Sequence, residues 1–252
     1  MLSIERHEKI LELLNKKRVV KVSELSQTLR VTEKTIRIDL EQLEEQNLLK
    51  RIHGGAILAE DGHTMLPIKE RQSRNSHVKQ AITEQALPMI TEGDTILLDG
   101  GSTTLALAEK LGDKPVTVIT NDIQIAHVLL EKEKVQLMVL GGTRIDTTAS
   151  LIGTQAINEL QKIHVNHLFL GTTGIHPTRG LTVFNSLHAD WKKQIMQIAN
   201  HITLLVDATK VGKIALIQYA EVSDIDHMIT DDQVDRSLLG DLEQKGVNVT
   251  VV

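Results

Sequence analysis

The chain has 252 residues, 41% of them hydrophobic and only 2% aromatic, so it can form one mid-sized and one small domain with aliphatic cores. It contains no cysteine, which excludes disulfides, thiolate metal sites and cysteine nucleophiles. The net charge of −5 is unevenly divided: residues 1–57 hold 11 Lys/Arg and 9 Asp/Glu, whereas residues 58–252 hold 17 and 24, which favours an N-terminal segment that approaches phosphate.

The N-terminal residues predict two helices. The start, residues 1–7, lacks the apolar region of a signal peptide, and no later apolar run approaches the ~18 residues of a membrane span. We therefore expect a soluble, cytoplasmic protein without a membrane partner. Apolar residues from Ile4 to Leu14 form one helical stripe, which ends at the charged run 15–18. A second helix is expected to begin with Ser23 as its N-cap.

A third helix is predicted to begin at Thr32, whose hydroxyl can cap the next turn. At about 100° per residue, an apolar stripe faces inward and consists of Ile36, Leu40 and Leu43. The outward side chains of the N-terminal half are Lys34, Thr35, Arg37 and Ile38. Acidic residues crowd the C-terminal half and would repel DNA phosphate. The helix is therefore expected to enter the major groove of double-stranded DNA by its N-terminal end.

A basic hairpin is predicted directly after this helix. Residues 48–52 form its first strand, and His53-Gly54-Gly55 turns the chain. Lys50, Arg51 and His53 would then contact the DNA backbone or minor groove, so residues 1–57 are predicted to form a winged helix-turn-helix domain. The alternatives are a three-helix bundle with solvating surface charges and, for His53, an ordinary turn residue.

Residues 58–76 are rich in polar residues, with a Gly and a Pro, and predict a linker. From residue 77 to 252 short aliphatic runs alternate with helical segments, which predicts an α/β domain around a mostly parallel sheet. The expected strands are 95–98, 116–119, 136–140, 167–170, 202–206, 227–230 and 247–252.

Polar loops follow five of these strands, where ligands of parallel sheets bind. The candidate binding residues are Asp99, Gly100, Gly101, Ser102, Thr103, Thr104, Thr120, Asn121, Gly141, Gly142, Gly171, Thr172, Thr173 and Lys210. The glycines and the helix N-terminus after Asp99 favour a phosphate group, Lys210 would add a positive charge, and Asp99 would accept from sugar hydroxyls. The alternative for each loop is ordinary turn chemistry.

Both parts of the chain resemble the DeoR-type bacterial transcriptional repressors. The first set of motifs is Thr35–Leu40 with Leu49–Ala56, and the second is Leu98–Thr104, Thr120-Asn121, Gly141-Gly142, Gly171, Gly174-Ile175, Gly180–Thr182 and Asp207–Lys210. The resemblance implies a repressor of sugar utilisation, an effector domain similar in fold to ribose-5-phosphate isomerase and glucosamine-6-phosphate deaminase, a phosphorylated sugar as effector, and a dimer or tetramer.

The chain departs from the family pattern at three positions. Ile38 stands where the family usually has a second Arg, so the operator sequence is not transferred from relatives. Thr173 and Asp190 stand where relatives carry Asp and Glu, near the expected sugar end of the site. Asp190 is counted among the candidate effector-binding residues, while the identity of the effector is not transferred.

Two other functions are compatible with single features. A sugar-phosphate isomerase could use Asp99 as base and Lys210 as the cation that stabilises an enediolate, but an isomerase has no use for residues 1–57. His164 and His167 could bind a metal, but they lead into a strand, where an ordinary surface role is expected. Trp191 is expected in the core or near the ligand rim. We predict no enzyme activity, no cofactor and no metal.

Overall fold

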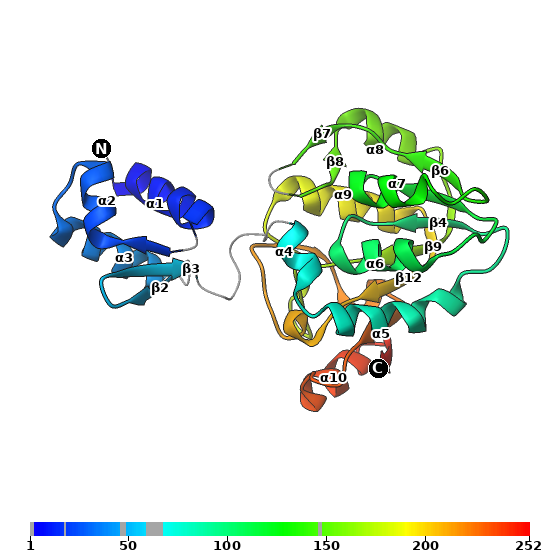
Figure 1. Cartoon of the computed structure of the whole chain (residues 1–252). Helices are drawn as coiled ribbons and strands as arrows, with labels where there is room; N and C mark the ends of the chain where they lie inside the picture. The colour runs from blue at the N-terminus through cyan, green and yellow to red at the C-terminus, as the bar shows by residue number, and fades with distance from the viewer. Residues whose placement is uncertain (1–2, 18, 46–48, 59–67, 146–147) are drawn as a thin grey trace. The chain divides into compact units, whose positions relative to one another are not determined.

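The computed structural model describes residues 3–17, 19–45, 49–58, 68–145 and 148–252 (Figure 1). It divides the chain into two compact units, Met1–Thr64 and Met65–Val252. Among the described residues no helix combines the length and apolar character needed to cross a membrane.

The described residues of the N-terminal unit form three helices and a small antiparallel sheet. In chain order its elements are α1 (Ser3–Lys17), β1 (Val19–Lys21), α2 (Val22–Leu29), α3 (Glu33–Glu45), β2 (Leu49–Ile52) and β3 (Gly55–Leu58). The strands pair in the order β1-β3-β2. Aliphatic side chains from all three helices and the sheet form the core, among them Ile10, Leu25, Ile36 and Leu40. This is the predicted helix-turn-helix with its basic hairpin; Leu48, which the prediction included, lies outside the described residues.

The start of α2 differs from the prediction. The helix begins at Val22 with Lys21 as its N-cap, and no side chain caps it, so the expected cap at Ser23 is wrong. The reason is the strand that comes immediately before. Val20 pairs with Ala56 in the sheet, and the amide of Val22 donates to the carbonyl of Gly54 at 2.9 Å. The sheet therefore satisfies a backbone donor at the helix start, which a side-chain cap would otherwise supply.

The segment 58–76, expected to be a linker, is partly regular structure. Residue 58 belongs to β3, residues 59–67 lie outside the described residues, and α4 occupies Ile68–Ser73. The buried Nζ of Lys79, on α5 (Ser76–Ala86), donates to the carbonyl of Arg71 at 2.7 Å and to that of Arg74. Lys79 thus satisfies carbonyl groups at the end of α4 and holds that helix to the C-terminal unit.

A seven-stranded sheet lies at the centre of the C-terminal unit. Its order is β15 (Asn248–Val251), β14 (His227–Thr230), β12 (Ala199–Leu205), β9 (Val165–Leu170), β4 (Thr95–Leu98), β5 (Thr117–Thr120) and β6 (Gln136–Val139). All six neighbouring pairs are parallel, which confirms the predicted α/β fold. The chain builds outward from β4 through β5 and β6, and then returns to β9 on the other side of β4. Strands β4 and β9 therefore flank the point where the strand order reverses.

Helices cover both faces of this sheet (Figure 1). α5, α6 (Ser102–Lys110) and α7 (Ile123–Leu129) contribute to the apolar cluster on one face. α8 (Thr154–Leu160), α9 (Ser186–Gln197) and α10 (Arg236–Glu243) contribute to the cluster on the other, together with a small antiparallel sheet of β10 (Gly174–His176), β11 (Gly180–Val183) and β13 (Ile217–Ala220).

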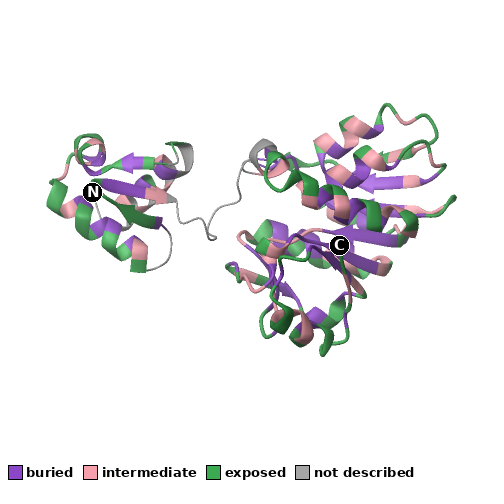
Figure 2. Ribbon diagram, turned by 60° about the horizontal axis from the view of Figure 1, so that its bottom comes forward, coloured by how far each residue is buried: buried purple, intermediate pink, exposed green. Residues whose placement is uncertain are grey.

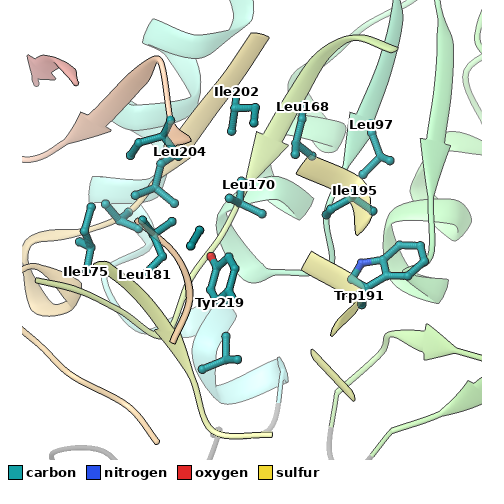
Figure 3. Close-up of a cluster of buried hydrophobic side chains, with 14 of the residues drawn as sticks. Leu97, Leu168, Leu170, Ile175, Leu181, Trp191, Ile195, Ile202, Leu204 and Tyr219 are labelled. Carbon is teal, nitrogen blue, oxygen red and sulfur yellow. The ribbon is translucent and has the colours of Figure 1, made fainter. Parts of the chain in front are cut away.

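The core of this unit is aliphatic, as the composition predicts. Figure 2 shows the buried residues along the central strands and the exposed residues on the outer sides of the helices. In Figure 3, Leu97 and Leu168 of the sheet lie beside Ile195 of α9, in the cluster that also holds Trp191. A short hairpin of β7 (Thr143–Arg144) and β8 (Leu151–Ile152) follows β6, and the 3-10 helices are Leu87–Met89, Ala208–Lys210 and Val222–Asp224.

Candidate functional site

The outward face of α3 carries the side chains predicted to meet DNA. Thr32 caps the helix as expected, since its Oγ1 accepts from the amide of Thr35 at 3.2 Å. Lys34, Arg37 and Ile38 are exposed. Arg37 donates from Nη2 to Oε2 of the exposed Glu33, one turn earlier, at 2.7 Å. An exposed pair of this kind stabilises little, so Arg37 can exchange it for a DNA group.

A buried ion pair fixes α3 against α1. Asp39 is 1% exposed and accepts from Nε and Nη2 of Arg6 at 2.5 and 2.6 Å. His7 Nε2 lies 3.2 Å from the same carboxylate. The carboxylate raises the pKa of Arg6, mainly through this side-chain hydrogen bond. Nothing in the spacing of residues 6 and 39 indicates that they meet, so this pair could not be predicted from the sequence.

The hairpin is attached to α3 by an acidic side chain. Arg51 donates from Nε to Oε2 of Glu44 at 2.6 Å, and its backbone amide donates to Oε1 of Glu44 at 2.8 Å. Glu41 lies 3.6 Å from the same guanidinium. The acidic half of α3 was expected only to repel phosphate, and the structure shows that it also positions the hairpin. Lys50 and His53, also predicted to contact DNA, are exposed.

A groove of about 460 Å³ separates α3 from the hairpin. Its lining is mixed polar and apolar: Val22, Arg37, Leu40, Glu44, Arg51, Ile52, His53, Gly54 and Gly55. Gly55 is required at the hairpin because a Cβ there would lie 2.0 Å from the carbonyl oxygen of Val20. The close approach of these backbones sets the position of the hairpin next to α3.

In the C-terminal unit, polar residues gather at the carboxyl ends of β4 and β9. Asp99, directly after β4, is 2% exposed and accepts from Trp191 Nε1 at 3.3 Å, from the amide of Gly171 at 3.3 Å, and from Lys192 Nζ. Lys192 also donates to the carbonyl of Gly171 at 2.8 Å. Asp99 was expected to accept from sugar hydroxyls, but its carboxylate is occupied by protein donors that tie the ends of β4 and β9 together.

The loop after Asp99 leads into the N-terminus of α6. Gly101 is the N-cap residue and no side chain caps the helix, so donors of its first turn are available to a ligand. A Cβ on Gly100 would lie 2.1 Å from Ser150 Oγ, so a larger residue there would have to displace the Ser150 side chain. Thr104 is buried and donates to the carbonyl of Asp99 at 2.6 Å. Ser102 and Thr103 are half-buried at this helix start.

Positive charges gather near this helix start. Burial lowers the pKa of Lys210; Asp207 acts in the opposite direction, while the positive charges of Arg71, Arg74 and Lys213 lower the pKa further. Burial also lowers the pKa of Arg71, against the effect of Asp122 and Asp99. We call Arg71, Arg74, Lys79, Lys210 and Lys213 the basic cluster. Three of its members come from the region around α4, where the sequence predicts a linker or the start of a helix and gives no sign of a ligand site.

The remaining candidate residues mostly bond within the protein. Thr120 donates to the carbonyl of Leu98 at 2.8 Å, and Thr172 donates to that of Thr182 at 3.1 Å. Asn121 is fully buried and donates from Nδ2 to the carbonyl of Leu151 at 3.0 Å, while its Oδ1 is buried without a hydrogen-bond partner. The buried Oγ1 of Thr173 likewise has no hydrogen-bond partner.

Three candidate positions lie away from these contacts. Gly142 has φ +151° and packs against the backbone of β8, where a Cβ would lie 2.6 Å from the carbonyl carbon of Ile152; Gly141 beside it is exposed. Asp190 is exposed on α9, whereas the next two residues, Trp191 and Lys192, are buried and contact Asp99. The helical turn of about 100° per residue explains why the neighbours of Asp190 face the site.

His167 is not the surface residue that the sequence favours. It is 6% exposed, lies 2.7 Å from Thr203 Oγ1 through Nε2, and stacks on Phe169 with ring centroids 4.2 Å apart. Burial and the nearby His201 lower its pKa to about 4. His164, three residues earlier, is exposed and bonds to Asn200 at 2.7 Å. Within the described parts of the chain no group of three or more His, Cys, Asp or Glu side chains is arranged to hold a metal ion.

Comparison with known proteins agrees with both units. The DeoR-like helix-turn-helix domain matches residues 6–61, and the DeoR C terminal sensor domain matches residues 74–232. The HTH-type transcriptional regulator YulB of Bacillus subtilis is 35% identical over 100% of this chain and 98% of its own length. The HTH-type transcriptional repressor GlcR of the same organism is 33% identical over 98% of this chain and 95% of its own length.

Among solved structures, ribose 5-phosphate isomerase A from Methanocaldococcus jannaschii matches 54% of this chain and 55% of its own, with 20% identity and a TM-score of 0.40. The two full-length relatives are named as helix-turn-helix transcriptional regulators, one of them a repressor. With both models matched in chain order, this chain belongs to the DeoR family of helix-turn-helix transcriptional regulators and is not an enzyme.

Proposed function

We propose that this regulator represses a carbohydrate-utilisation operon and is released from its operator by a phosphorylated sugar or a related metabolite. In this proposal α3 docks in the major groove through Lys34, Thr35, Arg37 and Ile38, with Thr32 at its start. Lys50, Arg51 and His53 of the hairpin lie along the DNA backbone.

The charge distribution on α3 and the hairpin supports this docking. The exposed cations Lys34 and Arg37 lie in the N-terminal half of the helix, and Lys50 is exposed on the hairpin. Because Glu44 and Glu41 neutralise Arg51, the acidic half of α3 presents less negative charge to DNA than the sequence suggests. The N-terminal half of the helix is thus the end that phosphate attracts.

The basic cluster is the observation that carries the sensing half of the proposal. Lys210 lies near the positive charges of Arg71, Arg74 and Lys213, and burial disfavours the charged forms of both Arg71 and Lys210. An anion would relieve this repulsion, and the uncapped N-terminus of α6 offers it backbone donors and a favourable helix dipole. A dianionic phosphate suits this combination. The site lies where the strand order reverses between β4 and β9, the usual ligand position in such sheets.

A sugar attached to this phosphate would meet polar groups that lack partners. Asn121 Oδ1 and Thr173 Oγ1 are buried without a hydrogen-bond partner, and an unsatisfied buried polar atom is costly. Asn121 Oδ1 can accept from a sugar hydroxyl, and Thr173 can donate or accept. Asp99 then has a positioning role, since Lys192, Trp191 and Gly171 occupy its carboxylate.

The coupling to DNA would pass through α4. This helix carries Arg71 and directly follows the segment that joins the two units. Binding of phosphate to Arg71 would change the balance of charges that holds α4 next to Asp99 and Asp122. In a homodimer or homotetramer, a shift of α4 would change the spacing between paired recognition helices, so that they no longer match two operator half-sites.

The test is fluorescence anisotropy of the full chain on DNA from upstream of its own and neighbouring genes. Each titration is repeated with inorganic phosphate, phosphorylated sugars and their unphosphorylated counterparts. We expect specific binding that only phosphorylated sugars weaken. Specific binding that none of these compounds changes would remove the sensing claim and leave the DNA-binding function in place.

Variants separate the two halves of the proposal. Lys210→Ala and Arg71→Ala should keep operator affinity in the absence of effector and lose the response to it. Lys245→Ala, which removes an exposed charge outside the basic cluster, is the matched control and should respond like the parent. If Lys210→Ala responded to the same effector concentration as the parent, phosphate binding at this site would be refuted.

A further inference from the structure

The most outward position in the N-terminal half of the recognition helix is occupied by an isoleucine. With about 100° per residue, the direction opposite to the mean of Ile36, Leu40 and Leu43 passes within about 15° of Ile38. Lys34, one turn earlier, lies within about 30° of it. Ile38 is 46% exposed, which agrees with this geometry. The centre of the face that meets DNA is therefore apolar.

The fold of the N-terminal unit does not account for Ile38. The described side chains that build its apolar cluster, or pack against it, do not include this residue. Its neighbours on the same face are charged: Lys34 one turn before and Glu41 three residues after, both exposed. An isoleucine that is 46% exposed among charges contributes less burial to stability than a core residue and leaves apolar surface in water. Contact with a ligand would remove the apolar surface of Ile38 from water.

The major groove offers one kind of apolar group to such a side chain, the C5-methyl of thymine. We infer that Ile38 packs against a thymine methyl and is the residue that specifies an A·T pair at one position in each half-site. Isoleucine has no side-chain donor or acceptor, so it cannot bond to guanine as an arginine would. Lys34 and Arg37 are left to contact phosphates and polar base edges on either side. This inference rests on the proposed docking of α3.

The experiment removes single methyl groups from the DNA. Binding sites are selected from a random-sequence pool by the full chain, and each thymine of the selected site is replaced in turn by deoxyuridine, which lacks only the C5-methyl. We expect one position per half-site at which this replacement weakens binding about fourfold, the effect of one buried methyl group. In Ile38→Ala the effect at that position should disappear, while replacements elsewhere keep their parental effect.

Two controls test the assignment. Val19→Ala truncates an equally exposed apolar side chain of the same unit outside α3, and it should keep the parental response at every thymine. Ile38→Val keeps an apolar contact and should keep most of the effect. Far-UV circular dichroism of Ile38→Ala should match the parent, because Ile38 lies outside the core.

Two results would overturn the inference in distinguishable ways. If the parent and Ile38→Ala lost the same affinity at every deoxyuridine position, Ile38 would have no role in reading thymine, while α3 would remain the recognition helix. If the full chain selected no sequence from the pool, the proposed DNA docking would fail, and the role of Ile38 would fail with it.

Discussion

Glu44 of the recognition helix binds Arg51 of the hairpin through both the guanidinium, at 2.6 Å, and the backbone amide, at 2.8 Å. These hydrogen bonds lower the pKa of Glu44, the backbone bond having the larger effect. The carboxylate therefore remains ionised and competes with DNA phosphate for Arg51. The number of cations that the hairpin offers to DNA depends on this one contact.

Replacement of Glu44 should change the salt dependence of DNA binding. Glu44→Gln keeps an acceptor for the amide of Arg51 but removes the charge, so Arg51 can pair with a phosphate. The slope of log Kd against log salt concentration should steepen by up to about 0.9, the value for one full phosphate contact, because Arg51 no longer divides its charge between Glu44 and DNA. Glu45→Gln removes the same charge from an exposed neighbour and should leave the slope close to that of the parent. Equal slopes for the two variants would contradict the competition.

Arg37 and Lys50 should contribute differently to affinity. In the proposed docking Arg37 reads a base, so Arg37→Ala is expected to cost about 1–3 kcal/mol on the operator and much less on random DNA. Lys50 contacts phosphate in the same proposal, so Lys50→Ala should weaken binding to both DNAs alike and flatten the salt dependence. Anisotropy titrations on the two DNAs over a range of salt concentrations give both quantities. Equal losses for Arg37→Ala on both DNAs would assign it to the backbone instead.

The buried pair of Asp39 and Arg6 should control the stability of the N-terminal unit. Asp39→Asn leaves the guanidinium of Arg6 without its counterion in a largely buried place, at a cost on the order of 3 kcal/mol. Hydrogen exchange of the amides of α1 and α3 in the full chain measures this loss. Glu33→Gln breaks the exposed pair with Arg37 and should change the free energy of opening measured by hydrogen exchange by less than about 0.5 kcal/mol.

Two lysines near the proposed effector site should contribute differently to the stability of the C-terminal unit. Lys192 is 4% exposed and neutralises Asp99, so Lys192→Ala should destabilise the C-terminal unit by about 3 kcal/mol. Lys210→Ala removes a cation that burial and neighbouring charges disfavour, so it should cost under about 1 kcal/mol or stabilise the unit. Urea unfolding followed by far-UV circular dichroism compares them. A large loss for Lys210→Ala would mean that this lysine is structural.

His167 should make the C-terminal unit sensitive to acid. Its pKa is lowered to about 4 in the folded state, whereas an unfolded chain has an ordinary histidine pKa near 6.5. Below about pH 6.5 this histidine is protonated in the unfolded state but stays neutral in the folded state. The free energy of unfolding therefore decreases as the pH falls towards 4. The loss should approach about 3 kcal/mol at most. Burial also lowers the pKa of His227, which adds to the same trend.

Urea midpoints at pH 7, 6 and 5 test this expectation. His167→Gln should show a smaller decrease in stability between pH 7 and 5 than the parent. His164→Gln, at an exposed position, serves as the control and should decrease as the parent does. If the stability of His167→Gln decreased between pH 7 and 5 as much as that of the parent, other groups would be responsible for the acid sensitivity.

Periodic features of the sequence predicted the fold well. The aliphatic runs gave the parallel strands, and the spacing of Ile36, Leu40 and Leu43 gave the buried face of α3, because burial follows the period of the element. The cap at Thr32 was also correct, since it depends only on neighbouring residues. The cap at Ser23 was wrong because pairing of β1 with β3, a contact distant in sequence, determines where α2 begins.

The candidate effector site was harder to predict, because it is formed by contacts between residues distant in sequence. The loop after β4 could be recognised from its glycines and hydroxyls. The place of Arg71 could not, because the polar run around it resembles a linker, and contacts distant in sequence, such as the burial of Ile68, bring its helix onto the unit. Asp99 was found, but its burial by Trp191 and Lys192 joins residues more than ninety positions apart.

Trp191 gives the protein an optical property of its own. It is the only tryptophan in the chain, and its indole N–H donates to Asp99 where the ends of β4 and β9 meet. Indole emission depends on the polarity and charge around the ring, so all of the tryptophan emission of the molecule comes from this one place. Tryptophan fluorescence can therefore report ligand binding at the proposed effector site in unlabelled protein, separately from DNA binding.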